Sequence, residues 1–579
     1  MIKGSHLTKR ILELIPASLS WTALSAPIIF IYTAPYLVAY FVVLFDLYWL
    51  FKAIFMGVHL VLGYLDIKKE TKIDWFSRLK KIKKLSQFQS EIERKITYLQ
   101  EKYPPISRKY SFFILPKKLR KEYQKLKEDY EEISFLKNLL SRPSLGITQE
   151  PEGRMGKIPT WETIYHLVLL ATYKEGKETL KSSINSYLES NFPSKKIIIT
   201  LAVEERAGKE ALENAQSLKK KYQDKFFDFL ISIHPSGLPD EIKAKGANLT
   251  WAAKNTIKPY LDSKKIPYGE VIVSAFDADT RVHPQYFACL TYKYLTSPSR
   301  EHRTFQPIPL YSNNIWQAPT FSRVVAFGAS FWQMIESTRP QRLVNFSSHA
   351  MSFETLYKIG FWAKDIVNED SAQFWRAYFT FDGDHRCIPL FTPVYMDAVL
   401  ASSYLKTLKN QYLQKQRWAY GVEHFPTIVI NSFKNKKIPW RKKGLWIFRV
   451  LEGHFSWATA SIFIATAGWL PILLNPHLRF YVPFFNMAPL ASRILSLSWI
   501  GIISSMFISL LLLPSPPLTF KKHRGLAMVF QWALMPFAAL FFGSIPALDA
   551  QTRLALGRYL EFWATEKAPA KSKSQPPSS

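Results

Sequence analysis

The stretch that decides the fold is Val271-Ile-Val-Ser-Ala-Phe-Asp277-Ala-Asp279, a hydrophobic run that enters directly into two carboxylates separated by one residue. A short apolar run of this kind, ending in polar residues, predicts a buried strand. Two carboxylates after such a strand can hold a divalent cation whose other ligands come from a diphosphate and water. Asp277 and Asp279 are therefore candidate ligands for Mg2+ or Mn2+, although acidic pairs at strand ends are also common in plain turns.

Similar β-rich runs alternate with helical stretches across the middle of the chain. The runs are residues 164–171, 196–203, 226–233 and 304–310, and the helical stretches between them include residues 177–189 and 207–222. This alternation predicts an α/β domain over residues 151–400 with a doubly wound, mostly parallel sheet. In such a sheet the ligand site lies at the carboxyl ends of the strands. The polar residues that follow the strands are therefore the candidate site residues.

The two ends of the 579-residue chain are apolar, so its mean hydropathy of -0.06 averages two kinds of sequence. Residues 18–65 form a nearly unbroken apolar tract, about twice the roughly 20 residues that cross a bilayer. We expect a transmembrane hairpin within residues 1–68. Further segments of bilayer length at 452–474, 494–513 and 526–545 predict C-terminal transmembrane helices within residues 451–546. The sequence is typical of a multi-pass membrane protein with a large aqueous domain.

The formal net charge of +31, with a pI of about 9.7, is compatible with nucleic acid, anionic lipid or a polyphosphorylated substrate as the partner. The basic residues cluster beside the apolar segments: Lys68, Lys69 and Lys72, then Lys436, Lys437, Arg441, Lys442 and Lys443, then Lys521, Lys522 and Arg524. The positive-inside rule makes these loops cytoplasmic. No RNA- or DNA-binding motif accompanies the charge, so no nucleic-acid partner is expected.

The two cysteines, Cys289 and Cys387, have neither metal-site spacing nor the number that a disulfide framework needs. We therefore expect a cytoplasmic domain whose cysteines are reduced. We also expect the protein to lie in a prokaryotic plasma membrane. The charged residues 69–150 predict a basic helical insert in the cytoplasm, with a helix pair broken at Pro104 and Pro105. Such an insert either lies on anionic lipid or docks a partner.

Two motifs follow the sheet region. Asn368-Glu369-Asp370 begins a helical stretch, and Asp370 is the candidate base that removes a proton from an attacking hydroxyl. An acid favoured by the helix dipole is the alternative explanation. Gln414-Lys-Gln-Arg417-Trp418 lies in predicted interfacial helices over residues 401–450. Arg417 can offset the charge of a leaving diphosphate and Trp418 can stack on a sugar ring, although an Arg-Trp pair is also common at membrane interfaces.

In this order the motifs resemble those of the processive family 2 glycosyltransferases, such as cellulose synthase and hyaluronan synthase. The family pattern is Asp-x-Asp, then Glu-Asp, then Gln-x-x-Arg-Trp, flanked by membrane helices, and the resemblance spans residues 165–567. It implies a Rossmann-like GT-A-type glycosyltransferase domain embedded between transmembrane helices. It also implies inverting, metal-dependent transfer from a nucleotide-diphosphate sugar to a growing polysaccharide. Glu369 then joins Asp370 at the catalytic centre, Asp277 and Arg417 contact the donor, and Gln414 and Trp418 contact the acceptor.

Weaker local matches extend the resemblance to other parts of the chain. Ala171-Thr172-Tyr173-Lys-Glu175 resembles the nucleotide-contacting Thr-Tyr-Asn-Glu segment, with Lys174 in place of Asn. Lys245 matches a stretch near the diphosphate, and Gln306 matches a strand that lines the acceptor site. Residues 547–567 are similar to an interfacial helix and gating loop, which implies gating roles for Phe562, Thr565 and Lys567. Residues 568–579, rich in Lys, Ser and Pro, predict a disordered tail.

Two features depart from the family. After the second strand the family usually places an Asp that contacts the base, whereas this chain has Glu204, so a Glu takes over that contact and donor preference stays open. In addition, two N-terminal and three C-terminal crossings would leave Thr565 and Lys567 outside the cell, where a gating loop has no use. We expect the final segment to be re-entrant, because Pro536 and Pro546 interrupt it.

Two other functions fit the same residues. The membrane helices could admit a lipid-linked acceptor, which makes the protein a non-processive transferase. Alternatively, the chain could be a membrane sensor that binds nucleotide or glycan without turnover, as the replacement at Glu204 suggests. In every case the expected partners are a nucleotide sugar, a glycan or lipid-linked acceptor and membrane lipid. The sequence does not identify an export partner.

Overall fold

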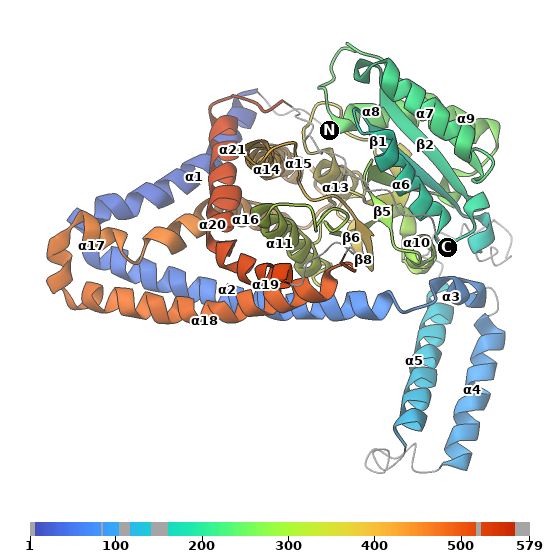
Figure 1. Cartoon of the computed structure of the whole chain (residues 1–579), viewed down its shortest axis with the longest axis horizontal. Helices are drawn as coiled ribbons and strands as arrows, with labels where there is room; N and C mark the ends of the chain where they lie inside the picture. Colours follow the sequence, from blue (N-terminus) through green and yellow to red (C-terminus); the bar gives the residue numbers. More distant parts are fainter. Residues whose placement is uncertain (1–5, 83–84, 104–115, 141–159, 517–522, 562–579) are drawn as a thin grey trace.

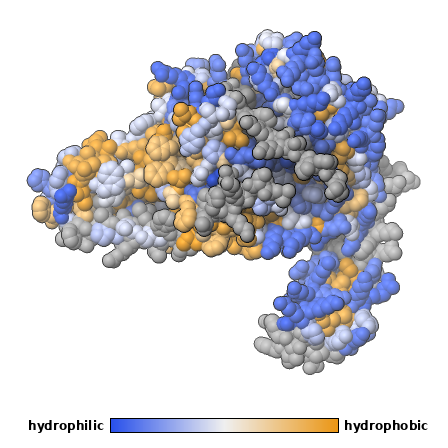
Figure 2. All heavy atoms as spheres, viewed as in Figure 1, coloured by the Kyte–Doolittle hydropathy of each residue, from blue (hydrophilic) through white to orange (hydrophobic). Residues whose placement is uncertain are grey.

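The computed structural model describes residues 6–82, 85–103, 116–140, 160–516 and 523–561. An α/β domain lies beside a group of long helices, and a two-helix arm projects away from both (Figure 1). Figure 2 shows that hydrophobic residues gather over the long helices, whereas the α/β domain and the arm are mostly hydrophilic on the same face.

The described residues of the domain form an eight-stranded sheet in the order β3-β2-β1-β4-β7-β6-β8-β5. The strands are β1 (Tyr165–Thr172), β2 (Ile197–Glu204), β3 (Asp228–His234), β4 (Val271–Asp277), β5 (Arg281–Val282), β6 (Arg303–Leu310), β7 (Ala350–Ser352) and β8 (Arg386–Tyr395). The first four are mutually parallel, and β6 is parallel to β8. β7 is antiparallel to β4 and β6, and β5 is antiparallel to β8. The sheet is therefore mixed but mostly parallel, as predicted.

The strand order indicates where a ligand would bind. The chain moves outward from β1 through β2 to β3, then returns to lay β4 on the other side of β1. Ligands of open α/β sheets bind at the carboxyl ends of the strands where the order reverses in this way. At that point Ala171 of β1 pairs with Asp277 of β4. The predicted site at the carboxyl strand ends therefore lies between β1 and β4.

Helices cover both faces of the sheet, which explains why every residue of β2 is buried. The main helices of one face are α6 (Lys177–Leu188), α7 (Lys209–Tyr222) and α10 (Tyr286–Thr296). Those of the other face include α8 (Lys245–Trp251), α9 (Lys258–Ser263) and α12 (Phe353–Lys358). The remaining helices near the domain are α11 (Thr320–Ser337), α13 (Glu369–Thr380), α14 (Tyr404–Ala419) and α15 (His424–Lys434).

The predicted α/β class is confirmed: the domain has a mostly parallel sheet covered by helices and lies next to apolar helices in the chain. The strands at 164–171, 196–203, 226–233, 271–276 and 304–310 were predicted to within two residues. Strands β5, β7 and β8 were not predicted from the sequence. Strands β5 and β7 are only two and three residues long, and β8 contains Pro389 and Pro393, which hide a strand pattern.

Three helical segments among the described residues are long and apolar enough to cross a membrane: His6–Thr33, Pro35–Glu70 and Met528–Ala555. The long helices are α1 (His6–Thr33), α2 (Pro35–Glu70), α16 (Trp440–Thr466) and α18 (Val482–Leu512). Shorter helices complete the C-terminal part: α17 (Leu470–Leu474), α19 (His523–Phe530), α20 (Met535–Ala539) and α21 (Ile545–Ala555). α2 and α18 pack side by side along the lower edge of Figure 1.

The last described helix returns to the start of the first. Arg10 of α1 donates hydrogen bonds to the carbonyls of Leu554 (3.2 Å) and Ala555 (2.8 Å) at the end of α21. At the other end of α1, Tyr32 donates to the carbonyl of Leu474 (2.9 Å). The segment from Met528 to Ala555 is irregular, with a 3-10 turn at Gln531–Leu534 and a π turn at Leu540–Ser544. α21 continues through Pro546, where the sequence analysis placed the end of the membrane segment.

The arm belongs to the basic insert. α3 (Trp75–Ile82) packs on α10, and α4 (Leu85–Lys102) lies beside α5 (Lys117–Leu140). The predicted break at Pro104 and Pro105 lies outside the described residues, as does most of the segment that joins the arm to β1.

Candidate active site

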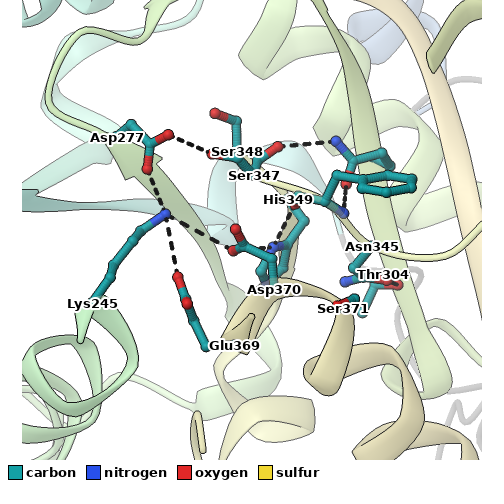
Figure 3. A network of polar contacts seen from close by, with 12 residues as sticks. Lys245, Asp277, Thr304, Asn345, Ser347, Ser348, His349, Glu369, Asp370 and Ser371 are labelled. Atoms are coloured by element: carbon teal, nitrogen blue, oxygen red, sulfur yellow. Dashed lines mark hydrogen bonds and ion pairs between the residues drawn. The ribbon is translucent and has the colours of Figure 1, made fainter. Parts of the chain in front are cut away.

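The site is built around Lys245, whose side chain points into a group of carboxylates (Figure 3). Its Nζ lies 2.6 Å from Oδ1 of Asp277, 3.9 Å from Oε1 of Glu369 and 3.9 Å from Oδ1 of Asp370. Burial alone would lower the pKa of the Lys245 ammonium, but the three carboxylates raise it above its ordinary value. Two motifs about 90 residues apart in the sequence thus meet at one lysine, together with a third segment that carries it.

Local packing explains why Lys245 reaches this place. Lys245 is the first residue of α8, and Asn248 one turn later donates to the carbonyl of Ala202 in β2 (2.7 Å). Gly246 follows Lys245, and a Cβ there would lie 2.2 Å from the carbonyl oxygen of Ala363 and 2.9 Å from Cβ of Glu369. Only a glycine allows the start of α8 to approach the start of α13 so closely.

The neighbouring acids Glu369 and Asp370 differ in access and charge. The Glu369 side chain is 4% exposed and that of Asp370 is 21% exposed. Burial, together with the charge of Asp370, raises the pKa of Glu369, and Lys245 and Arg417 only partly oppose this rise. Burial also acts to raise the pKa of Asp370, but Lys245 and His349 outweigh it, so that pKa is lowered. Asp370 is thus the ionised and reachable member of the pair.

The loop before β7 completes the site and was missed by the sequence analysis. Nδ1 of His349 lies 3.3 Å from Oδ1 of Asp370 and 3.0 Å from the carbonyl oxygen of Phe346. Both neighbours are acceptors, so Nδ1 carries the proton. Ser347 donates to Oδ2 of Asp277 (2.7 Å). No motif marks this loop in the sequence, and its link to the site depends on the three-residue strand β7.

The predicted metal ligands fit a divalent cation by their chemistry. Asp277 ends β4 with its side chain one-third exposed, and Asp279 is buried in the following turn. One oxygen of Asp279 accepts the backbone N–H of Asp397 (2.9 Å). No cluster of three or more His, Cys, Asp or Glu side chains suited to a metal occurs among the described residues. A cation here would therefore take few protein ligands and complete its shell from diphosphate and water, as Mg2+ commonly does.

Four of the seven predicted donor residues, Thr172, Tyr173, Glu175 and Glu204, lie at the ends of β1 and β2. Glu175 accepts the backbone N–H of Tyr173 (2.6 Å) and the hydroxyl of Thr172 (3.2 Å), which closes the turn after β1. Glu204 ends β2 and forms an ion pair with Arg206. The Arg206 guanidinium lies 4.7 Å from the ring centroid of Tyr173. Arg206 therefore joins the two strand ends, a role that no motif in the sequence indicated.

The Gln-x-x-Arg-Trp motif lies at the end of α14, near Glu369 and Asp370. Asn368, just before Glu369, donates to the carbonyl of Arg417 (2.9 Å). The Trp418 ring lies 6.0 Å from that of Tyr311, and Nζ of Lys415 lies 4.2 Å from the Trp418 ring centroid. Burial lowers the pKa of Lys415 to about 7.

The two predicted acceptor glutamines are largely occupied by the protein itself. Gln306 is fully buried and bonds the segment before His349: its amide donates to the carbonyl of Ser347 (3.0 Å) and its oxygen accepts the N–H of Phe346 (2.8 Å). Gln414 accepts a hydrogen bond from Gln411 (3.2 Å). Gln306 therefore supports the loop that carries Ser347 and His349.

Glu423 was also missed by the sequence analysis. Its Oε1 accepts the backbone N–H of Asn368 (3.1 Å), so it holds the turn that leads into Glu369 and Asp370. Burial raises the pKa of Glu423 to about 8. The predicted gating residues Phe562, Thr565 and Lys567, like the predicted disordered tail, lie outside the described residues.

No protein-family model matches the chain, and no curated protein sequence matches it. Solved structures that resemble it include a mannosyltransferase from Pyrobaculum calidifontis in complex with GDP-Man and Mn2+, at 15% identity over 63% of this chain and 92% of that chain, with a TM-score of 0.36. TarS 1–349 from S. aureus in complex with UDP-GlcNAc is 10% identical over 68% of this chain and 93% of that chain, with a TM-score of 0.31. Both TM-scores are below 0.5, so neither likeness identifies a donor, an acceptor or a mechanism for this chain.

Proposed function

We propose that the chain is a membrane glycosyltransferase that moves a sugar from a nucleotide-diphosphate sugar onto a growing polysaccharide at the cytoplasmic face. The observation that carries this proposal is the meeting of Asp277, Glu369 and Asp370 around Lys245 at the carboxyl ends of β1 and β4. Asp370 is ionised and reachable by solvent, so it is suited to removing a proton. It lies beside other carboxylates and the Lys245 ammonium, at the point where the strand order reverses and where α/β sheets commonly bind nucleotides, so the proton would be removed beside a diphosphate.

In the proposed reaction Asp370 takes the proton from the acceptor hydroxyl as its oxygen bonds to the anomeric carbon of the donor. The bond from that carbon to the diphosphate breaks on the opposite face, so the configuration is inverted. Arg417 offsets charge on the leaving nucleoside diphosphate, and Trp418 stacks on the acceptor sugar. Asp277 and Asp279 would hold Mg2+ or Mn2+, which neutralises diphosphate charge when bound.

The donor occupies the strand ends in this proposal. Tyr173, backed by Arg206 and Glu204, offers a ring and polar groups to the nucleoside, while Thr172 and Glu175 shape the turn under it. Lys245 lies near the diphosphate. The family 2 assignment, the processive mode and the gating roles of Phe562, Thr565 and Lys567 rest on the sequence motifs and belong to the same proposal.

The direct test is hydrolysis and transfer by detergent-purified protein with a panel of nucleotide sugars, in Mn2+, in Mg2+ and in EDTA. We expect one donor to release nucleoside diphosphate, with EDTA abolishing the release. Product length with a radiolabelled donor then separates polymerisation from single addition: products with one added sugar on a lipid would refute polymerisation. No release from any donor with either metal would favour the sensor function.

The base is tested by Asp370→Asn. The carboxamide cannot accept the proton, so turnover should fall by about 10²- to 10⁴-fold. Donor binding, measured by calorimetry, should change little. Asp240→Asn is the matched control, because Asp240 is exposed and its φ of 57° suits Asn. Unchanged turnover in Asp370→Asn would remove Asp370 from the mechanism.

A further inference from the structure

An open cavity of about 710 Å³ lies where the ends of two apolar helices meet the edge of the sheet. Its walls come from the end of α2, the residues that end and follow α18, and the region of β5, β6 and β8. In Figure 1 the cavity lies at the end of α2 that leads into α3. The cavity therefore borders both the apolar helices and the aqueous domain.

The polar part of this cavity is basic. Lys68 and Arg281 contribute the charge of its lining, and none of its lining residues in the described chain is Asp or Glu. His283 also lines the cavity, but burial lowers its pKa, so it adds a neutral ring. Within the described part of the chain, Lys68 and Arg281 form no ion pair. The nearby acid Glu70 is already engaged, because its carboxylate contacts Nζ of Lys293 (2.8 Å) and accepts the N–H of Phe391 (3.0 Å). The cavity thus holds positive charge that the described chain does not neutralise.

The other part of the cavity is apolar. Leu511 and Leu512 at the end of α18 and the following Leu513 line it, and Leu511 is 62% exposed. The exposed side chains of Leu62 and Leu65 extend along α2 toward the same place. Exposed leucines beside basic residues that form no ion pair in the described chain are the arrangement that an amphiphilic anion matches, with its chains on the leucines and its charge at the basic residues.

We propose that this cavity binds the phosphate-bearing headgroup of an anionic membrane lipid. Arg281 and Lys68 bond the phosphate oxygens, since charge-assisted hydrogen bonds from Arg to phosphate are strong and directional. The acyl chains lie against Leu511 and the outer face of α2. The inference goes beyond the proposed transfer reaction and does not require it, because lipid binding is measured without turnover.

The cavity also adjoins the catalytic turn. Arg281 lies two residues after Asp279, and Asn313, which lines the cavity, donates to the carbonyl of Asp279 (3.0 Å). Substitutions at Arg281 could therefore disturb the fold of the turn. For this reason Lys68, an exposed residue on α2, is the primary position for the test and Arg281→Lys serves as the charge-conserving variant.

The experiment measures lipid bound to the detergent-purified full chain by native mass spectrometry, titrated with phosphatidylglycerol or with phosphatidylcholine of the same acyl chains. Wild type should bind phosphatidylglycerol in preference. Lys68→Gln combined with Arg281→Gln should weaken that binding at least about tenfold, since each basic residue contributes on the order of 1 kcal/mol near anionic lipid. Lys69→Gln removes the same charge from the neighbouring exposed position, outside the cavity lining, and should bind like wild type.

Three results would overturn the proposal: equal binding of the two lipids by wild type, unchanged binding in the double variant, or equal weakening in Lys69→Gln. A further arm adds inorganic phosphate. If free phosphate displaces phosphatidylglycerol at comparable concentration, the cavity recognises a soluble anion and the lipid assignment is wrong. If Arg281→Lys still binds phosphatidylglycerol and Lys68→Gln loses that binding, the result supports the assignment, because neither variant removes a side chain that the fold of the turn needs.

Discussion

At the scale of single residues, the site separates two adjacent acids into different protonation states. Glu369 and Asp370 follow one another in the chain, but His349 and Lys245 stabilise the charge of Asp370, while burial and that same charge keep the proton on Glu369. Two carboxyls with pKa values moved in opposite directions are a common sign of acid and base roles in an active site. The assignment of Asp370 as the base therefore rests on this difference as well as on its greater exposure.

The role of His349 is tested by its effect on the pH profile. His349→Leu removes the donor beside Asp370, so the pKa of Asp370 should rise. A base works only when deprotonated, so the acid limb of kcat/KM should move to higher pH, by about one unit for the loss of one hydrogen bond to a charged group. His349→Gln, which restores a donor, should move the limb back. A pH profile of His349→Leu identical to that of wild type would show that His349 does not act on the base.

At the scale of elements, the close contact between α8 and the start of α13 sets the position of Lys245. Gly246→Ala puts a Cβ against the carbonyl of Ala363, so the helix start must move away. We expect a loss of about 1–3 kcal/mol in stability and a marked fall in kcat. Gly328→Ala is the control, because nothing lies within 4 Å of a Cβ at this position in α11.

These two variants are compared by thermal unfolding in detergent and by turnover. The control should be neutral or gain about 0.5–1 kcal/mol, as an interior helical glycine often does when replaced by alanine. Equal Tm and kcat for Gly246→Ala and Gly328→Ala would mean that the contact between α8 and α13 does not constrain the site.

Much of the sheet could be predicted at this scale, because β1 to β4 are apolar runs with helices between them. Asp277 and Asp279 were found for the same reason: they end such a run. The segment Asn345–His349 could not be found, since its importance comes from a hydrogen bond to Asp277 and a contact with Asp370 that only the folded chain creates. The hydrogen bonds of Gln306 likewise reach that segment, so its own strand pattern could not predict them.

At the scale of the whole molecule, the described ends of the chain meet. Arg10 near the start of α1 bonds the end of α21, and Tyr32 at the far end of α1 bonds Leu474. If α1 crosses the bilayer, the start of α1 and the end of α21 lie on one side and the turn between α17 and α18 lies on the other. That arrangement would put the end of α21 on the same side as the start of α1, which the count of apolar segments alone did not allow.

This topology is tested with single cysteines. The native Cys289 and Cys387 are buried, so the background of labelling in native vesicles should be low. We expect Lys9→Cys and Arg558→Cys, both at exposed positions, to react with an impermeant maleimide from the cytoplasmic side only. Arg479→Cys, exposed between α17 and α18, should react from the opposite side only. Labelling of positions 9 and 558 from different sides would contradict the arrangement.

The attachment of α2 to α10 and β8 also has a mechanical consequence. The helix runs unbroken for 36 residues, about 54 Å at 1.5 Å per residue, well beyond the roughly 30 Å of a bilayer core. Its last residue, Glu70, is fastened to Lys293 of α10 and to the backbone of β8. A helix fixed at one end to the sheet acts as a lever. If α2 crosses the bilayer, a change in its tilt would therefore move Glu70, and with it the parts of α10 and β8 that Glu70 contacts.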